Sequence, residues 1–149
     1  MRRLFAGLIA LFACVPLVFA DDGLVSVKSA HDVETTASRL ETSLKEKGMT
    51  VFIRVDQAAG LKVRKQLRPS ELLVFGNPKV GTPLMLCAQT AGIDLPQRAL
   101  IWEDENGQVW LSYNDPRYLA ARHGITECAA TTTKIEHAHG KFAIAAAQP

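Results

Sequence analysis

The spacing of apolar residues predicts a helix in the first third of the chain. Four apolar positions recur at intervals of four, three and four, which aligns them on one helical face: Val33, Ala37, Leu40 and Leu44. Ser29 with Asp32 three residues later resembles a capping box, and Gly48 suits the left-handed position that follows a helix. We therefore expect a helix over 29–48.

The pattern then changes to a period of two, which is typical of a strand with one buried face. The alternating apolar positions are Met49, Val51, Ile53 and Val55. We expect this strand to end at Asp56 and to be followed, over 57–69, by a basic short helix or loop. The run Leu72 to Phe75 is apolar at every position. It predicts a central strand covered on both faces, with a buried helical turn as the alternative.

The tripeptide Gly76-Asn77-Pro78 interrupts this run and predicts the start of a second helix. Asn77 would cap the helix, and Pro78 would take the first helical position, where a missing N–H has no consequence. The apolar stripe that follows comprises Val80, Leu84, Cys87 and Ala91. Cys87 is therefore expected to face the core.

Two apolar segments, 100–102 and 109–111, flank Asn106-Gly107 and predict a β-hairpin. Asn-Gly suits a two-residue type I′ turn, because both of its central residues need a positive φ. In that register Trp102 lies opposite Leu111, and the two tryptophans point to opposite faces of the sheet.

A short helix and a long terminal segment complete the chain. The sequence Asn114-Asp115-Pro116 repeats the pattern of a cap followed by proline and predicts a helix that ends at Gly124. Six residues at helical spacing favour a last helix: Ile125, Cys128, Thr132, Ile135, His139 and Phe142. Its threonines leave a strand over 131–139 as the alternative, and we interpret 143–149 as a frayed tail.

The order of these elements, β-α-β-β-α-β-β-α-α, predicts an α+β fold. We expect a two-layer sandwich in which helices pack on one face of a mostly antiparallel sheet. A single domain over 21–142 accounts for all of the predicted elements.

The first twenty residues differ from the rest of the chain in charge. Arg2 and Arg3 precede an uncharged run from Leu4 to Ala20, and two aspartates follow directly. A basic start, an apolar stretch and small residues before the cut are the three parts of an export signal. We expect cleavage after Ala20 and a periplasmic or secreted protein.

Two alternatives stay open for this segment. An uncleaved anchor needs about 20 apolar residues to span a bilayer, whereas this run is shorter and contains Pro16. Lipidation at Cys14 is the second alternative, because Leu11 to Cys14 faintly resembles a lipobox, although Phe12 is bulky for one. The cleaved signal is favoured, so no stable membrane insertion is expected after cleavage.

Composition and charge exclude several classes of protein. The 149 residues are 48% hydrophobic and 21% charged, unlike disordered, collagen-like or polytopic membrane chains. The net charge of +2 belongs to Arg2 and Arg3, so residues 21–149 carry 15 basic and 15 acidic side chains. A neutral domain lacks the basic surplus that phosphate contacts need, which argues against a nucleic-acid partner.

Several segments are more specific than these patterns. They are ELLVFGNPKVGTPLM over 71–85, LP at 95–96, ALIWED over 99–104, VWLSYNDP over 109–116 and RHG at 122–124. Together they closely resemble family 302 of the domains of unknown function, from about Ser29 to about Cys128. The resemblance implies a compact α+β domain that is often homodimeric and has no activity established for the family as a whole. Members often carry Asp-His after the second strand, whereas here Gln57 follows Asp56, so a histidine role at that position is absent.

The turn over 76–82 is the best candidate site. A strand that feeds a helix aims several N–H groups at one point, where the helix dipole favours a small anionic molecule. The candidate ligand-binding residues are Asn77, Lys79, Gly81, Thr82, Asn114 and Asp115, the last two because they could face the same end of the sheet. The alternative is a tight, self-capped turn without a ligand.

Four histidines raise the question of a metal site. His137 and His139 are two apart, a spacing that shares a side on a strand but diverges on a helix. His139 falls on the apolar stripe and His137 off it. His123 lies in the last turn before Gly124, where a helix dipole favours a partly positive imidazole. The spacing of zinc ligands is missing, so we expect no metal and no cofactor.

The two cysteines outside the expected signal are Cys87 and Cys128. Both fall on apolar stripes that pack toward one core, in a compartment where disulfides persist. We expect a disulfide that encloses a loop of about 42 residues, with two separate buried thiols as the alternative.

No nucleophile with an adjacent base is recognisable in the sequence. The leading hypothesis is therefore a non-catalytic domain that binds a small ligand or a partner and forms a homodimer. The alternative hypothesis is a small hydrolase or redox enzyme that uses the turn over 76–82.

Overall fold

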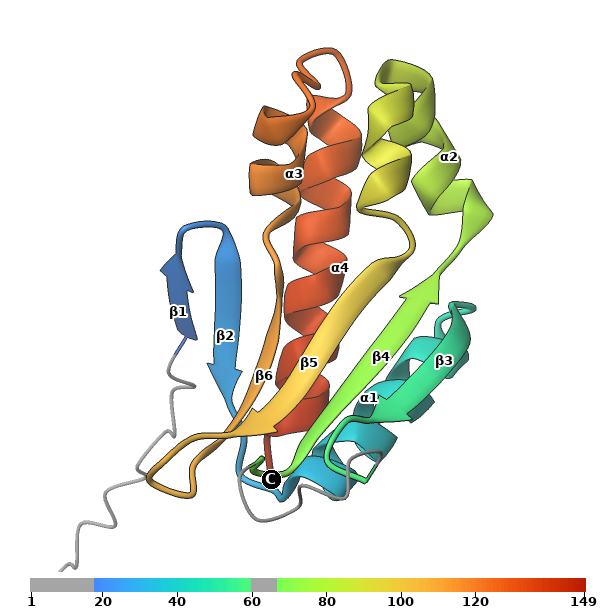
Figure 1. Ribbon diagram of the computed structural model, residues 1–149. Coiled ribbons are helices and arrows are strands. Elements are labelled where there is room, and N and C mark those ends of the chain that lie inside the picture. The colour runs from blue at the N-terminus through green and yellow to red at the C-terminus, as the bar shows by residue number, and fades with distance from the viewer. Residues whose placement is uncertain (1–17, 60–66) are drawn as a thin grey trace, which may run out of the picture.

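Six antiparallel strands form one sheet in the computed structural model, which describes residues 18–59 and 67–149 (Figure 1). The strand order is β1-β2-β6-β5-β4-β3. The strands are β1 (Val18–Asp21), β2 (Leu24–Lys28), β3 (Thr50–Asp56), β4 (Ser70–Gly76), β5 (Gln97–Glu103) and β6 (Val109–Asn114). The helices are α1 (Val33–Glu46), α2 (Pro78–Cys87), the 3₁₀ helix η1 (Gln89–Ile93), α3 (Pro116–Arg122) and α4 (Ala129–Ala147). The predicted α+β class and the predicted order from β2 onward are confirmed.

Helices α1 and α4 cover one face of the sheet (Figure 1). The core lies between these layers, and its most enclosed side chains include Leu40, Leu44, Leu73, Ile101 and Leu111. Helix α4 runs past the end of the sheet, where α2 and α3 flank it (Figure 1). A second buried cluster fills that region and comprises Leu84, Ala91, Ile125 and Ile135.

The predicted stripe of α1 is buried, but the helix starts later than expected. Asp32, not Ser29, is the N-cap, and its carboxylate accepts a hydrogen bond from the Thr35 N–H at 2.7 Å. Ser29 instead bonds the Thr36 hydroxyl at 2.7 Å inside the core. Gly48 follows the helix with a φ of +73°, as predicted.

The alternation predicted for β3 is wrong beyond Val51. Val51 pairs with Phe75, but Ile53 pairs with Val74, so Phe52 forms a bulge. After the bulge, each side chain of β3 points to the face opposite the one that strict alternation predicts. Phe52 and Ile53 are therefore exposed, while Arg54 turns toward α1 and pairs with Glu71 and Glu41. Of the expected basic helix or loop, 57–59 form a turn, and 60–66 lie outside the described residues.

Strand β4 is central, but within residues 18–59 and 67–149 helices cover only one of its faces (Figure 1). Leu73 and Phe75 are buried under the helices, whereas Leu72 and Val74 are half-buried on the opposite face. The prediction of cover on both faces is therefore wrong. An apolar run does not require two covering layers, because neighbouring side chains of the sheet can partly bury the second face.

The hairpin forms, but its predicted register is wrong. The Asp104 carboxylate accepts hydrogen bonds from the N–H groups of Asn106 and Gln108, at 2.8 and 2.9 Å, and closes a longer loop. Only Gly107 in that loop has a positive φ, +75°. Trp102 consequently pairs with Trp110, and both tryptophans lie on the same face of the sheet.

The second helix is shorter than its predicted stripe. Asn77 and Pro78 start it as predicted, but α2 ends at Cys87, and Ala91 belongs to η1. Leu84 is the buried residue of α2, whereas Cys87, in the last turn, is exposed. The prediction that Cys87 faces the core is therefore wrong.

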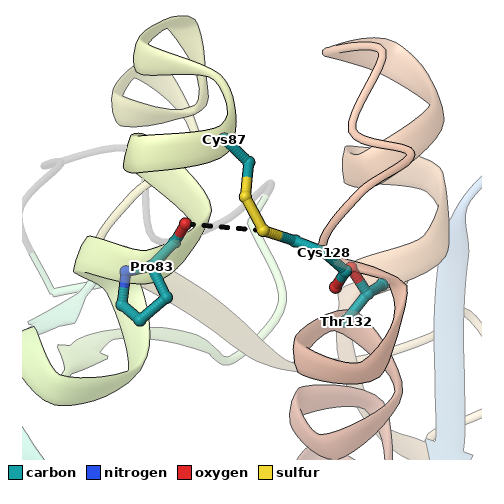
Figure 2. Close-up of a disulfide and its surroundings, with 4 residues drawn as sticks. All are labelled: Pro83, Cys87, Cys128 and Thr132. Atoms are coloured by element: carbon teal, nitrogen blue, oxygen red, sulfur yellow. Dashed lines mark hydrogen bonds between the residues drawn. A yellow bond between two sulfur atoms is a disulfide. The ribbon is translucent and has the colours of Figure 1, made fainter.

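The predicted disulfide between Cys87 and Cys128 is present and joins α2 to the start of α4 (Figure 2). The two Cα atoms are 6.5 Å apart, within the range that a disulfide bridges. The sulfur of Cys128 also lies 3.8 Å from the Pro83 carbonyl oxygen.

The C-terminal segment is helical, so the helix prediction is confirmed over the strand alternative. Asp115 caps α3, and Gly124 ends it with a φ of +64°, as predicted. The frayed tail is a wrong prediction, since α4 continues to Ala147 and packs on α1. The Arg39 guanidinium donates to the carbonyl oxygens of Ala145, Ala146 and Gln148, which fixes this helix end.

Candidate functional site

A cavity of about 290 Å³ opens between α2, the loop before β5, the start of β3 and α4. Its walls are mostly apolar and include Met49, Phe52, Met85, Leu95 and Ile135. The volume equals that of about ten liquid waters at ~30 Å³ each, which suits a small organic molecule. Ligand sites are typically apolar pockets of this kind with a few polar groups.

His139 of α4 lines this cavity while remaining only 5% exposed. Its ring packs edge-to-face against Phe75 and Tyr113, with ring centroids 5.7 and 5.5 Å away. Burial lowers the pKa of His139 to about 4, so the imidazole is neutral near pH 7. The sequence placed His139 on the core-facing stripe, and the structure confirms that position.

The Nδ1 atom of His139 is enclosed and has no hydrogen-bond partner among the residues that the structure describes. A neutral imidazole carries one N–H donor and one acceptor nitrogen. An unpaired buried polar atom destabilises the fold, so the packing of His139 against its neighbours does not by itself explain why an imidazole occupies this position.

Gln97 of β5 is the second buried polar residue of the cavity wall, at 7% exposure. Its side-chain amide makes no hydrogen bond within residues 18–59 and 67–149. An amide has two N–H donors and one acceptor oxygen. The cavity therefore holds two unpaired polar side chains from different elements, which is a set that sequence reasoning missed.

The predicted turn over 76–82 borders the same cavity. Asn77, Gly81 and Thr82 belong to its lining, but Lys79 does not. The Asn77 side chain accepts from the Lys79 N–H and donates to the Gly48 carbonyl, both at 2.9 Å. The backbone carbonyl oxygen of Asn77 accepts from the N–H groups of Val80 and Gly81, so the first donors of α2 already have partners.

Asn114 and Asp115 lie at the same end of the sheet as this turn (Figure 1). They do not reach the cavity lining, because Asp115 caps α3 and pairs with Arg117. The six predicted ligand residues therefore divide into three at the cavity and three outside it.

The described lining of the cavity offers no counter-charge to an ion. Among the described residues of its lining there is no Lys, Arg, Asp or Glu. An ion that entered it would lose its hydration without gaining a charged partner.

Hydrogen bonds join Asp94, His123 and Thr90, and the first two of these residues line a second, smaller cavity. His123 Nε2 is 2.6 Å from an Asp94 oxygen, and Nδ1 is 3.1 Å from the Thr90 hydroxyl. This order of groups can transfer a proton, but the adjoining cavity measures only about 10 Å³, too small for a substrate. We interpret these hydrogen bonds as structural contacts that hold η1 against the end of α3.

The other histidines are dispersed. His137 is exposed on α4, whereas His31 Nε2 is 2.8 Å from the Gln148 carbonyl oxygen. Within the described ranges, no three His, Cys, Asp or Glu side chains come together in a metal-binding group. No helix of the described part is both long and apolar enough to cross a bilayer.

Residues 25–141 match the family described as "Domain of unknown function DUF302". The chain therefore belongs to this family of domains, whose function is not established. A solved relative, the "uncharacterized conserved protein DUF302 from Bacillus stearothermophilus", superposes with a TM-score of 0.75 at 19% identity. The superposition covers 83% of this chain and 98% of that one, and it supports the fold.

Among curated proteins, the chain is similar to two proteins named as fluoride-specific ion channels. It is 52% identical over 106 residues to FluC 1 of Brucella suis biovar 1 (strain 1330), covering 70% of this chain and 42% of that protein. The identity to FluC 2 of Brucella melitensis biotype 1 is also 52% over 106 residues, covering 39% of that protein. The chain thus spans about two fifths of the length of these relatives.

Proposed function

We propose that this protein is a non-catalytic domain that binds a small organic molecule in the cavity beside α2 and α4. One observation carries the proposal: the apolar cavity contains two buried polar side chains, Gln97 and His139, without hydrogen-bond partners in the described structure. A ligand that pairs with both side chains would supply hydrogen bonds that they lack in the described structure.

Thermal unfolding with a library of small molecules tests this proposal. A ligand that binds the native state at a hundredfold excess over its Kd stabilises that state by about 2.7 kcal/mol, which raises the Tm. Gly81→Leu should abolish the increase, because a Cβ at Gly81 already comes within 3.6 Å of Leu95 across the cavity wall.

Gly140→Leu is the matched control for that substitution. Gly140 is also a helical glycine, but a Cβ there meets open space. Both substitutions raise helix propensity, and only Gly81→Leu fills the cavity. If no molecule raises the Tm of the wild type, or if Gly81→Leu responds as the wild type does, the cavity is not the binding site.

We also propose that the domain acts outside the cytoplasm. The support is the export-signal pattern over 1–20 together with the Cys87–Cys128 disulfide, a bond that oxidising compartments preserve. Residues 1–17 lie outside the described residues, and cleavage after Ala20 would leave only Asp21 of β1.

Self-association through the open face of the sheet is the third part of the proposal. That face carries a row of apolar side chains from four strands: Ile53, Val55, Leu72, Val74, Leu100, Trp102 and Trp110. No helix covers it in the described structure (Figure 1). Aromatic side chains on such a face favour contact with a second copy.

We include fluoride among the compounds to be tested because the curated relatives are named as fluoride-specific ion channels. The described lining of the cavity offers no cationic side chain to an anion. We therefore expect sodium fluoride to leave the Tm at the value that sodium chloride of equal concentration gives.

A further inference from the structure

We infer that the cavity selects an uncharged, single-ring carboxamide-type molecule whose polar end pairs with Gln97 and His139. The inference rests on the proposed small-molecule binding and adds the chemical class of the ligand. It does not use the turn donors or Lys79, which an anionic ligand would need.

The charge of the ligand follows from the cavity wall. The described lining has no ionised side chain, and its two buried polar groups, an amide and a neutral imidazole, are both uncharged. The amide can both donate and accept, and the imidazole donates at one ring nitrogen and accepts at the other. They therefore complement a group that is itself both donor and acceptor, as a primary carboxamide is, whereas a carboxylate or an ammonium group supplies only one of these roles.

The shape of the apolar part of the ligand follows from the apolar residues of the lining. Met49 and Met85 bring two thioethers to the lining, and Phe52, 56% exposed at the bulge of β3, belongs to the same lining. Thioether sulfur makes favourable contacts with aromatic rings. At about 290 Å³, the cavity accommodates one ring with a short polar substituent.

Two walls of the cavity are fixed relative to each other. The Cys87–Cys128 disulfide ties α2, which supplies Gly81 and Met85, to α4, which supplies Ile135 and His139 (Figure 2). A site held in this way loses little conformational entropy on binding. The protein with its disulfide intact is therefore the form to test.

Isothermal titration with benzamide, benzoate and benzylamine tests the ligand class, because the three probes share one ring and differ in charge. Benzamide should bind to the wild-type protein. Benzoate and benzylammonium should each bind at least roughly tenfold more weakly, because the cavity does not replace the hydration that each ion loses. Gln97→Leu and His139→Phe should each weaken benzamide binding by about fivefold, the equivalent of one net hydrogen bond.

Thr132→Val is the control substitution. Thr132 is a buried polar residue of the same helix, α4, that bonds the Cys128 carbonyl and does not belong to the cavity lining, so its loss should leave benzamide affinity unchanged. Equal or tighter binding of benzoate overturns the inferred class while small-molecule binding stands. The inferred class is also overturned if none of the three probes binds while another molecule of the library raises the Tm of the wild type and leaves that of Gly81→Leu unchanged. If no molecule of that library binds either, the proposed function fails as well.

Discussion

Trp102 of β5 lies directly opposite Trp110 of β6, on the face of the sheet that no helix of the described residues covers (Figure 1). Each indole N–H is held within the hairpin, by the Ser112 hydroxyl and by the Asp104 carboxylate respectively, both at 2.9 Å. The pair is therefore rigid, and its rings continue the apolar row of β3 and β4. This arrangement supports the expectation that two copies of the chain associate through their sheets.

Ile53→Lys should shift the protein toward the monomer. Ile53 is 50% exposed on the open face, and a lysine there would be buried without a partner in a sheet-to-sheet contact. Sedimentation or light scattering measures the change. Ile144→Lys, at a residue 42% exposed on α4, is the control and should leave the association unchanged. A wild type that stays monomeric at high concentration would contradict the prediction.

The hairpin also illustrates where sequence reasoning fails. Asn106-Gly107 correctly marked the turn, because Gly107 does need a positive φ. The pattern did not reveal that the Asp104 carboxylate would bond two backbone N–H groups and lengthen the loop. A single local contact of this kind changes the register, and with it the face on which each tryptophan lies.

Elements whose stability is local were predicted well. The stripe of α1 and the caps at Asn77 and Asp115 depend on residues within one or two turns of each other. The bulge at Phe52 depends on the partner strand, and the helical end of α4 depends on Arg39, more than a hundred residues away. Tertiary contacts decide such features, so periodicity alone does not contain them.

In the candidate site, too, local features were predicted from the sequence and features set by tertiary contacts were not. The turn over 76–82 was recognised as a potential site, and every residue of it except Lys79 borders the cavity. The unpaired groups come from β5 and α4, which the fold brings together from distant parts of the sequence. His139 stood out only as a histidine on an apolar stripe, and no local signal marked Gln97.

Loss of the disulfide should destabilise the protein substantially. The Cys87–Cys128 bond closes a loop with a sequence separation of 41, and loop-closure entropy gives roughly 4 kcal/mol for such a loop. Urea unfolding of the double variant Cys87→Ala with Cys128→Ala, compared with the wild type, measures the difference. Alkylation of both thiols in unfolded but unreduced exported protein would show that the bond does not form.

Acid should weaken the fold through His139. The unfolded imidazole binds a proton below its usual pKa of about 6.5, whereas burial lowers the native pKa to about 4. The unfolded state therefore gains protons first, and native stability falls as the pH drops from 6.5 to 4. Between pH 7 and pH 5 this contribution amounts to about 2 kcal/mol.

Urea unfolding at these two pH values measures the effect. His139→Phe removes the titrating group but keeps a ring against Phe75 and Tyr113, so its stability should fall less over the same interval. Thr132→Val, on the same helix, should retain the full pH dependence of the wild type. An unchanged pH dependence in His139→Phe would show that the buried imidazole does not titrate in this way.

Export should remove the first twenty residues. If the signal is cut after Ala20, the intact mass of protein recovered from the periplasm or medium corresponds to a chain that starts at Asp21. Replacing Arg2 and Arg3 by glutamate should retain the chain inside the cell, because the basic start of the signal is lost. Full-length protein in the cytosol or the membrane of the wild-type strain would contradict export.

Binding in the cavity can be observed through its methionines. The chain has three methionines, and two of them, Met49 and Met85, line the cavity, while Met1 lies outside the described residues. Protein labelled with ¹³C at the methionine methyl groups and mixed with benzamide should give intermolecular NOEs from the ring protons to the methyl groups of both Met49 and Met85. The same NOEs should be absent in Gly81→Leu. If benzamide at saturating concentration gives no NOE to either methyl group of the wild-type protein, this cavity is not the binding site for the class of ligand that we infer.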